Sequence, residues 1–384
     1  MASRTALHLA LLLCVNAPSG LRAQANVPRW SVDTAPIREL GSTSVPSVDL
    51  GNIVGIVLLR DGALAIADQG EQTIRLLSPD GRQLRSVGRR GSGPGEFRSL
   101  SGLAAAGDTL IAMENPPGIA QLQRFVDGHY LDGLLLQSDD SRGQLSATAR
   151  FRDGALLVQP GGFSVATPPP LGTLRRDSTT LGVFATTAPR RVRWLGRFPS
   201  VTWMAFELPG EPGRVTMGVQ TLAPALVMAT SGALAWIGDS ETGLVRLVST
   251  SGDSVRTLSL RTRRRPFDAQ ALERARLTEL DAAASDFAKA RVQEKYRARS
   301  RPEAAPHFSR FVAGEQGSMW IQLFDADPGR PSEWLVIDET GRQLAQASLP
   351  AGFKLWSVTR DAVAGVYTSE DGDESVRVLR LRTR

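Results

Sequence analysis

Charged side chains gather at one recurring position in this sequence, directly after short apolar runs, and in the glycine-rich segment at residues 88–97. Asp and Asn in such places can accept hydrogen bonds from the N–H groups of turns. If the loops share one face of the fold, the same residues form a polar rim that could bind a protein, glycan or peptide. The candidate binding residues are Asp68, Glu71, Arg89, Arg90, Glu114, Asn115, Asp239, Glu241 and Asp325.

Residues for metal or nucleophilic chemistry are scarce. Of three histidines, His8 lies in a segment that we expect to be removed, and His129 and His307 are too far apart in sequence to form a His-based metal site. Cys14 is the only cysteine. No nucleophile-elbow or phosphate-loop motif is present. We therefore expect no catalytic residue, no metal and no cofactor.

The elements that position the charged residues are clearest in residues 54–103. Four strand-like runs follow one another, each bounded by a turn signal such as Asp61-Gly62 or Pro79-Asp80-Gly81. Residues 57–59 and 63–67 are apolar without alternation, which is typical of strands covered on both faces. A four-stranded sheet cannot bury both faces alone, so further copies are expected.

An apolar residue in the second strand of each unit marks the copies. These residues are separated by 46, 46, 78, 85 and 44 residues, and a period of roughly 40–50 residues is typical of propeller blades. The two long intervals must hold insertions. The six anchor residues are Leu64, Leu110, Leu156, Leu234, Met319 and Val363.

The chain resembles bacterial six-bladed β-propellers of the NHL-like and TolB-like kind. The resemblance rests on the link at residues 88–97, on Ala67-Asp68 followed by Ile74-Arg75, and on the opening segment at residues 30–41. It covers the chain from about residue 30 to the end. It implies a fold and little about chemistry, because propellers host unrelated functions.

Gluconolactonase-like propellers, which this chain resembles in fold, supply the alternative function. They hold a divalent cation in the central channel, where the first strands would need carboxylates for Ca²⁺. Here those strands offer mostly hydroxyls. The channel candidates are Asn52, Ser101, Ser146, Thr148, Ser309, Ser357 and Thr359, with Asp49 just before the first strand.

The first 25 residues are typical of a secretory signal peptide. A short apolar core follows Arg4, and Ala23-Gln24-Ala25 is a small-x-small cleavage site. The apolar run is too short to span a bilayer. We expect an exported protein, periplasmic or extracellular, whose mature part is one domain over residues 26–384.

The charge excess is local. The whole chain carries a net charge of +6, and residues 261–301 alone hold twelve Arg and Lys against six Asp and Glu. A nucleic-acid footprint over the whole protein is therefore absent. The same segment predicts a helix over residues 269–298, capped by Asp268, within a helical insertion at residues 262–306. Residues 160–170 and 199–218 are rich in Pro and Gly, which predicts long loops.

The last unit has only three strand-like runs, and residues 37–40 form a strand without a unit, so their pairing would complete the sixth blade. The sequence thus predicts an all-β, six-bladed propeller of four-stranded blades, closed by the N-terminal strand, with one helical insertion between blades four and five. The predicted function is non-catalytic binding or scaffolding outside the cytoplasm by a monomer that does not span the membrane and binds no nucleic acid. The alternative is a metal-dependent lactonase or related hydrolase.

Overall fold

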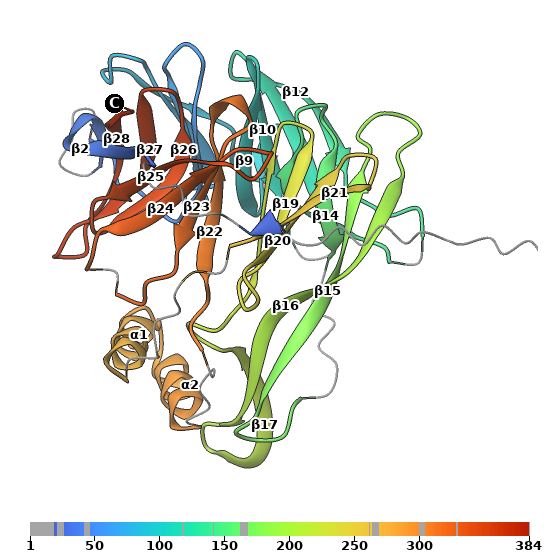
Figure 1. The fold of residues 1–384 in the computed structure, drawn as a ribbon, viewed down its shortest axis with the longest axis vertical. Coiled ribbons are helices and arrows are strands. Elements are labelled where there is room, and N and C mark those ends of the chain that lie inside the picture. Colours follow the sequence, from blue (N-terminus) through green and yellow to red (C-terminus); the bar gives the residue numbers. More distant parts are fainter. Residues whose placement is uncertain are drawn as a thin grey trace, which may run out of the picture.

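The computed structural model describes residues 19–20, 27–41, 47–116, 119–140, 142–161, 168–260, 262, 269–298, 304–327 and 329–383. The fold is mostly β, with two helices (Figure 1). The expected cleavage site at Ala25, Cys14 and the expected capping residue Asp268 lie outside the described residues.

Six antiparallel sheets follow one another along the chain. Sheet one contains β3 (Ile53–Leu58), β4 (Leu64–Asp68), β5 (Thr73–Leu77) and β6 (Leu84–Val87). Sheet two contains β9 (Leu100–Ala106), β10 (Thr109–Glu114), β11 (Gln121–Val126) and β12 (His129–Leu135). Sheet three contains β13 (Leu145–Arg150), β14 (Leu156–Pro160), β15 (Leu174–Phe184), β16 (Val192–Leu208) and β17 (Glu211–Val219).

The second half of the chain repeats this plan. Sheet four contains β18 (Leu226–Ser231), β19 (Leu234–Asp239), β20 (Leu244–Ser249) and β21 (Ser254–Ser259), with β1 (Ser19–Gly20) parallel to β21. Sheet five contains β22 (Phe308–Ala313), β23 (Met319–Leu323), β24 (Ser332–Ile337) and β25 (Gln343–Leu349). Sheet six contains β26 (Phe353–Val358), β27 (Ala362–Thr368), β28 (Glu374–Arg382) and β2 (Arg29–Leu40). Short elements are β7 (Arg89–Arg90) parallel to β8 (Glu96–Phe97), and the 3-10 turn η1 (Glu315–Gly317).

The six predicted anchors all lie in the second strands of the sheets, which confirms the repeat. The reason for their continuous apolar runs is visible in β4. Leu64 and Ile66 pack against sheet six, whereas Ala65 and Ala67 pack against sheet two. Since alternate side chains of a strand point to opposite faces, a strand between two sheets must be apolar at every position.

Six apolar clusters of this kind hold the sheets together, one between each pair of successive sheets and one between sheet six and sheet one. The sheets therefore form a propeller-like ring. The first strands β3, β9, β13, β18, β22 and β26, which we call the inner strands, lie against one another around it.

The strand that we expected to complete the sixth unit does pair there. In β2, Arg38 lies opposite Val378, Glu39 opposite Arg377 and Leu40 opposite Val376. The strand is longer than expected, because its first residues also run parallel to β25, with Trp30 opposite Ala347. Sheets five and six thus form one eight-stranded sheet through β2.

The helical insertion contains two helices, so the prediction of one helix over residues 269–298 was wrong. Helices α1 (Ala269–Asp281) and α2 (Asp286–Arg297) lie between β21 and β22. Ser285 separates them, because its backbone is extended and its hydroxyl accepts a hydrogen bond from the N–H of Ala288, as an N-cap does. The helices then fold onto each other, and Lys295 of α2 pairs with Glu279 of α1 at 2.9 Å.

The predicted loop at residues 199–218 was also wrong. These residues complete β16 and form most of β17, and together with the start of β15 they extend beyond the body of sheet three (Figure 1). Gly210 has a φ of 75° in the two-residue turn between β16 and β17, and Gly213 has a φ of 80° in β17, where the register shifts. Of the other predicted loop, residues 162–167 lie outside the described residues.

The alternating strand directions give the ring two faces. The turns that follow the second strands, and the links between sheets, lie on what we call the rim face. The turns that join first to second strands and third to fourth strands lie on the opposite face, which we call the hairpin face. Neither helix in the described part of the chain is long and apolar enough to cross a membrane.

Candidate functional site

Asp68, at the end of β4 on the rim face, is fully buried and bonded within its own sheet. Its carboxylate pairs with the Nε of Arg75 at 3.1 Å and accepts the backbone N–H of Glu71 at 3.1 Å. The N–H of Gly51, which lies just before β3, donates to it at 3.4 Å. These contacts fix the turn after β4 to the start of the inner strand, so the carboxylate is committed to the fold.

Glu114 has the same place in sheet two and is also buried, at 2% exposure. Its carboxylate accepts the backbone N–H of Arg98 at 2.7 Å and the side-chain amides of Gln121 and Gln123 at 2.5 and 2.7 Å. Gln123 in turn accepts the N–H of Gly95 at 2.8 Å. Glu114 thus anchors the glycine-rich link to the sheet that follows it.

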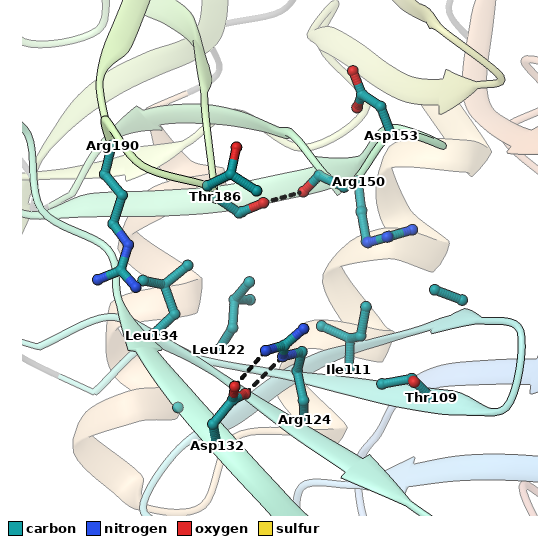
Figure 2. A pocket seen from close by; sticks show the side chains of 14 residues that line it. Thr109, Ile111, Leu122, Arg124, Asp132, Leu134, Arg150, Asp153, Thr186 and Arg190 are labelled. Carbon is teal, nitrogen blue, oxygen red and sulfur yellow. Dashed lines mark hydrogen bonds and ion pairs between the residues drawn. The ribbon is translucent and has the colours of Figure 1, made fainter.

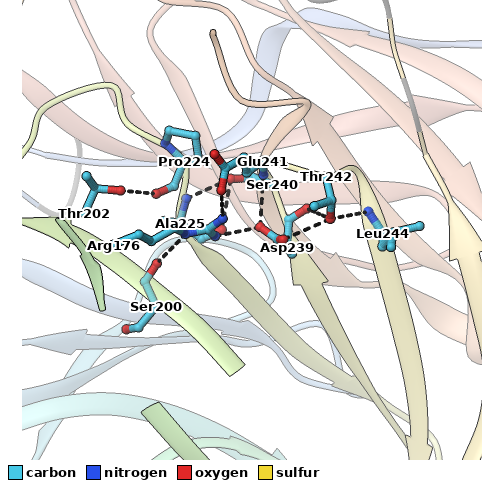
Figure 3. Close-up of polar contacts among 10 residues, drawn as sticks. All are labelled: Arg176, Ser200, Thr202, Pro224, Ala225, Asp239, Ser240, Glu241, Thr242 and Leu244. Carbon is cyan, nitrogen blue, oxygen red and sulfur yellow. Dashed lines mark hydrogen bonds and ion pairs between the residues drawn. The ribbon is translucent and has the colours of Figure 1, made fainter. Parts of the chain in front are cut away.

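Asp239 and Glu241 are the predicted residues that the structure brings together most closely (Figure 3). Arg176 of β15 reaches across from sheet three and pairs with Asp239 at 2.6 Å and with Glu241. Asp239 also accepts the Thr242 hydroxyl at 2.9 Å. This ion pair ties the extended part of sheet three to sheet four.

The other predicted residues lie in the turns after second strands, except Arg89 and Arg90, which form β7 in the link between sheets one and two. Glu71 is exposed, and Arg89 pairs with Glu96 at 2.8 Å. Arg90 donates to the carbonyl of Gly70 at 2.7 Å, Asn115 donates to the Ser146 hydroxyl at 3.1 Å, and Asp325 accepts the N–H of Asp327 at 3.0 Å. The nine residues therefore share a face of the fold, and they do not converge on one site.

A cleft that the sequence did not reveal lies between sheets two and three on the hairpin face (Figure 2). Its volume is about 320 Å³. The floor is apolar and includes Ile111, Leu122 and Leu134, while Arg150 reaches it from the end of β13 and Arg190 from the turn between β15 and β16. Ligand pockets usually combine an apolar lining with a few polar groups in this way, at volumes of about 300–1,000 Å³.

The charges in the cleft are unequally paired. Arg124 and Asp132 form a two-point ion pair, with Nε–Oδ1 at 2.6 Å, and this contact lowers the pKa of Asp132. Burial lowers the pKa of Arg150, an effect that the nearby Asp153 carboxylate opposes. Within the described part of the chain, neither Arg150 nor Arg190 forms an ion pair. Arg190 also helps to lower the pKa of Asp132, so the cleft sets three guanidinium groups against two carboxylates and has an excess of positive charge for an anion.

This cleft was not predicted from the sequence. Its arginines come from a third strand, from the end of a first strand and from a turn, so they share no position in the repeat. One signal could have been found. Across the six inner strands, the charged residues are Arg150, Arg310 and Lys354, and all three are cations.

The side chains of the inner strands are also relevant to the alternative function, a metal-dependent lactonase or related hydrolase. The hydroxyls of Ser101 and Thr148 donate to the carbonyls of Met113 and Leu157 on neighbouring strands, at 3.1 and 3.0 Å. The cations Arg310 and Lys354 would repel a divalent metal ion placed near them. Among the described residues, no group of three or more His, Cys, Asp or Glu could hold a metal.

Comparison with known proteins gives no family. No protein-family model matches the chain, and no curated protein matches its sequence. Among solved structures it is similar to a Bacteroides fragilis protein whose name describes it only as exported, with 14% identity over 95% of this chain and 99% of that one, and a TM-score of 0.49.

Two similar structures are enzymes by name. Virginiamycin B lyase from Staphylococcus aureus has 10% identity over 92% of this chain and 99% of its own, with a TM-score of 0.41. PQQ-bound aldose sugar dehydrogenase from Streptomyces coelicolor has 12% identity over 92% and 98%, with a TM-score of 0.44. Their names differ in activity, and the propeller-like ring described above rests on this chain's own sheets.

Proposed function

We propose that this protein is an exported, non-catalytic binding propeller that recognises a carboxylate ligand with an apolar body in the cleft between sheets two and three. One observation carries the proposal. Arg150 and Arg190 lie at an apolar floor in that cleft, with no ion-pair partner in the described part of the chain. An acidic peptide segment has the matching chemistry.

The recognition chemistry follows from the residues. Guanidinium groups bind carboxylates through two parallel N–H donors, which fixes orientation as well as charge. Ile111 and Leu122 would cover an apolar side chain next to the carboxylate. Thr186 donates to the Gly154 carbonyl at 3.1 Å, so the turn after Arg150 and the turn that carries Arg190 are already held to each other. A site organised before binding loses less entropy when its ligand arrives.

Export is part of the proposal and rests on the signal-like residues 1–25 and on the resemblance to bacterial NHL-like and TolB-like propellers. Cleavage after Ala25 would leave Asn26 as the first residue. Mass spectrometry of the protein recovered from the envelope and medium of an expressing bacterium should find that N-terminus. An intact residue 1, or an acylated Cys14, would contradict it.

The binding test uses an array of short peptides in pairs that differ only by Glu or Gln beside leucine. Wild-type protein should retain the Glu member of a pair and release the Gln member. The double variant Arg150→Gln/Arg190→Gln should lose most of this preference, because each charged hydrogen bond is worth about 1.5–3 kcal/mol. Arg256→Gln is the matched control, since Arg256 is exposed on β21, away from the cleft.

Two results would overturn the proposal. If wild type retains Glu and Gln peptides equally, the protein has no preference for the anion. If the double variant keeps the preference of wild type, the peptides bind elsewhere on the protein. Lactone hydrolysis above background that EDTA abolishes would favour the metal-dependent alternative.

A further inference from the structure

A second basic site lies on the opposite side of the ring, where the inner strands of sheets five and six meet. The guanidinium carbon of Arg310, on β22, lies 4.6 Å from the ring centroid of Trp356 on β26. The ammonium of Lys354 lies 5.3 Å from the same centroid. Two cations thus share one indole ring.

This arrangement has an electrostatic cost. Burial lowers the pKa of Arg310 to about 10, and no ion pair or hydrogen bond offsets that burial in the described part of the chain. Lost hydration and the positive charge of Arg310 both lower the pKa of Lys354, although its side chain is exposed, and Glu374 opposes the change only in part. Like charges held this close destabilise the fold unless something negative joins them.

Trp356 lies at a β-bulge in β26. Leu355 lies opposite Gly365 and Ser357 opposite Ala364, so Trp356 is an extra residue with no partner on β27. A bulge of this kind re-aims a side chain. Its indole N–H is buried and has no acceptor among the described residues, which is an uncommon and costly state for a buried donor.

We propose that Arg310, Lys354 and Trp356 form a binding site for a phosphate or sulfate group at the inner edge of the ring. All three side chains can only donate hydrogen bonds, so the site suits a ligand whose exposed atoms are all acceptors. Two cations suit a doubly charged group better than a single carboxylate. The indole N–H that lacks an acceptor is a further donor for an oxygen of the anion.

The site is distinct from the cleft between sheets two and three, because no residue is shared. It also differs in chemistry, since the cleft has an apolar floor and two aspartates, whereas the carboxylate that acts on this site is Glu374, which only partly offsets the charge of Lys354. Phosphate binding and peptide binding can therefore succeed or fail independently.

The test is calorimetric titration of the whole protein with inorganic phosphate and with glycerol phosphate, against sodium chloride at equal ionic strength. Wild type should bind phosphate and chloride should not substitute. Arg310→Gln should weaken binding by about tenfold or more, and Lys354→Gln by about two- to fivefold. If glycerol phosphate binds more tightly than inorganic phosphate, the natural ligand is a larger phosphorylated molecule. If the two bind equally, the ligand is phosphate itself. Either outcome supports the site.

Trp356→Phe keeps the ring and removes the N–H. Phosphate should change the tryptophan fluorescence of wild type and leave that of this variant unchanged. If Arg310→Gln fails to fold, the exposed Lys354→Gln and the Phe variant still decide the matter. The proposal would be overturned if the fluorescence of wild type changed equally with phosphate and with chloride. It would also be overturned if Arg256→Gln lost as much phosphate binding as Lys354→Gln.

Discussion

The carboxylates of the rim face and the arginines of the cleft differ in how far the fold uses their charge. Asp68 and Glu114 are buried, and each accepts hydrogen bonds from backbone N–H groups and a side chain. Arg150 and Arg190 have no comparable partner in the described part of the chain. Charge that recurs at one position of a repeat can thus serve the repeat itself, whereas charge outside that pattern is available for binding.

The physical reason lies in what each side chain can offer. A carboxylate is an acceptor on a short stem, so it suits the unpaired N–H groups of a tight turn. Sheets one, two and four each place a carboxylate at the end of the second strand, as Asp68, Glu114 and Asp239, where it accepts a backbone N–H. A guanidinium has only donors on a long stem, and nothing in the repeat requires one at the cleft.

The largest effect is expected from Asp68→Ala, which breaks a buried ion pair and leaves Arg75 without its partner. Urea denaturation should show a loss of about 3–5 kcal/mol in the free energy of unfolding. Glu71→Ala, an exposed residue in the same turn, is the control and should stay within about 0.5 kcal/mol. Similar small losses for both would mean that Asp68 is not committed to the fold.

Glu114→Gln should have a smaller effect. The amide keeps the shape but replaces one acceptor oxygen by a donor that faces the amides of Gln121 and Gln123. We expect a loss of about 1–3 kcal/mol in thermal or urea unfolding. If the variant is as stable as wild type, the fold does not depend on the charge of Glu114. The difference between the rim-face carboxylates and the cleft arginines would then be smaller than we infer.

Arg190→Gln tests the other side of the comparison. This exposed arginine makes no ion pair in the described part of the chain, so unfolding free energy should change by no more than about 0.5 kcal/mol. The same variant should lower retention of acidic peptides. A clear loss of stability would show that Arg190 also serves the fold.

The smallest effect is expected on the stability of the protein at low pH. The N–H of Arg142, together with Ser138 and Trp194, lowers the pKa of Asp140 from its ordinary 3.8 to about 2. A carboxyl whose pKa is lower in the folded state stabilises the protein above 3.8, and this contribution is lost as the pH falls towards 2. The stability difference between wild type and Asp140→Asn should therefore shrink over that pH range in a series of melting curves. A constant difference would mean that Asp140 has no lowered pKa.

Much of the ring could be predicted because its strands are buried on both faces. The runs around Leu64, Leu110 and Leu234 are apolar for that reason, and each ends at a turn residue with a recognisable role. Departures from the repeat were harder to predict from the sequence. Ser285 follows three alanines that favour helix, and only the pairing of Ser285 with Asp286 marks a new helix start.

The candidate site was less predictable than the fold. The positions of the rim residues followed from the repeat, but their partners, such as Arg176 from another sheet, depend on how the sheets pack. The same holds for Arg310 and Trp356, which are 46 residues apart and meet only through a bulge. Contacts between sheets leave no periodic trace in a single sequence.

The pairing of β2 with both β25 and β28 has a consequence for how the protein is made. Glu39 bonds to Arg377, 338 residues later, so residues 32–40 of β2 meet their partner strand only when β28 is synthesised. Until then β27 presents an open edge, and such edges readily pair with other chains. A polypeptide that stops before residue 374 would keep the edge of β27 exposed and would leave residues 32–40 of β2 without a partner strand.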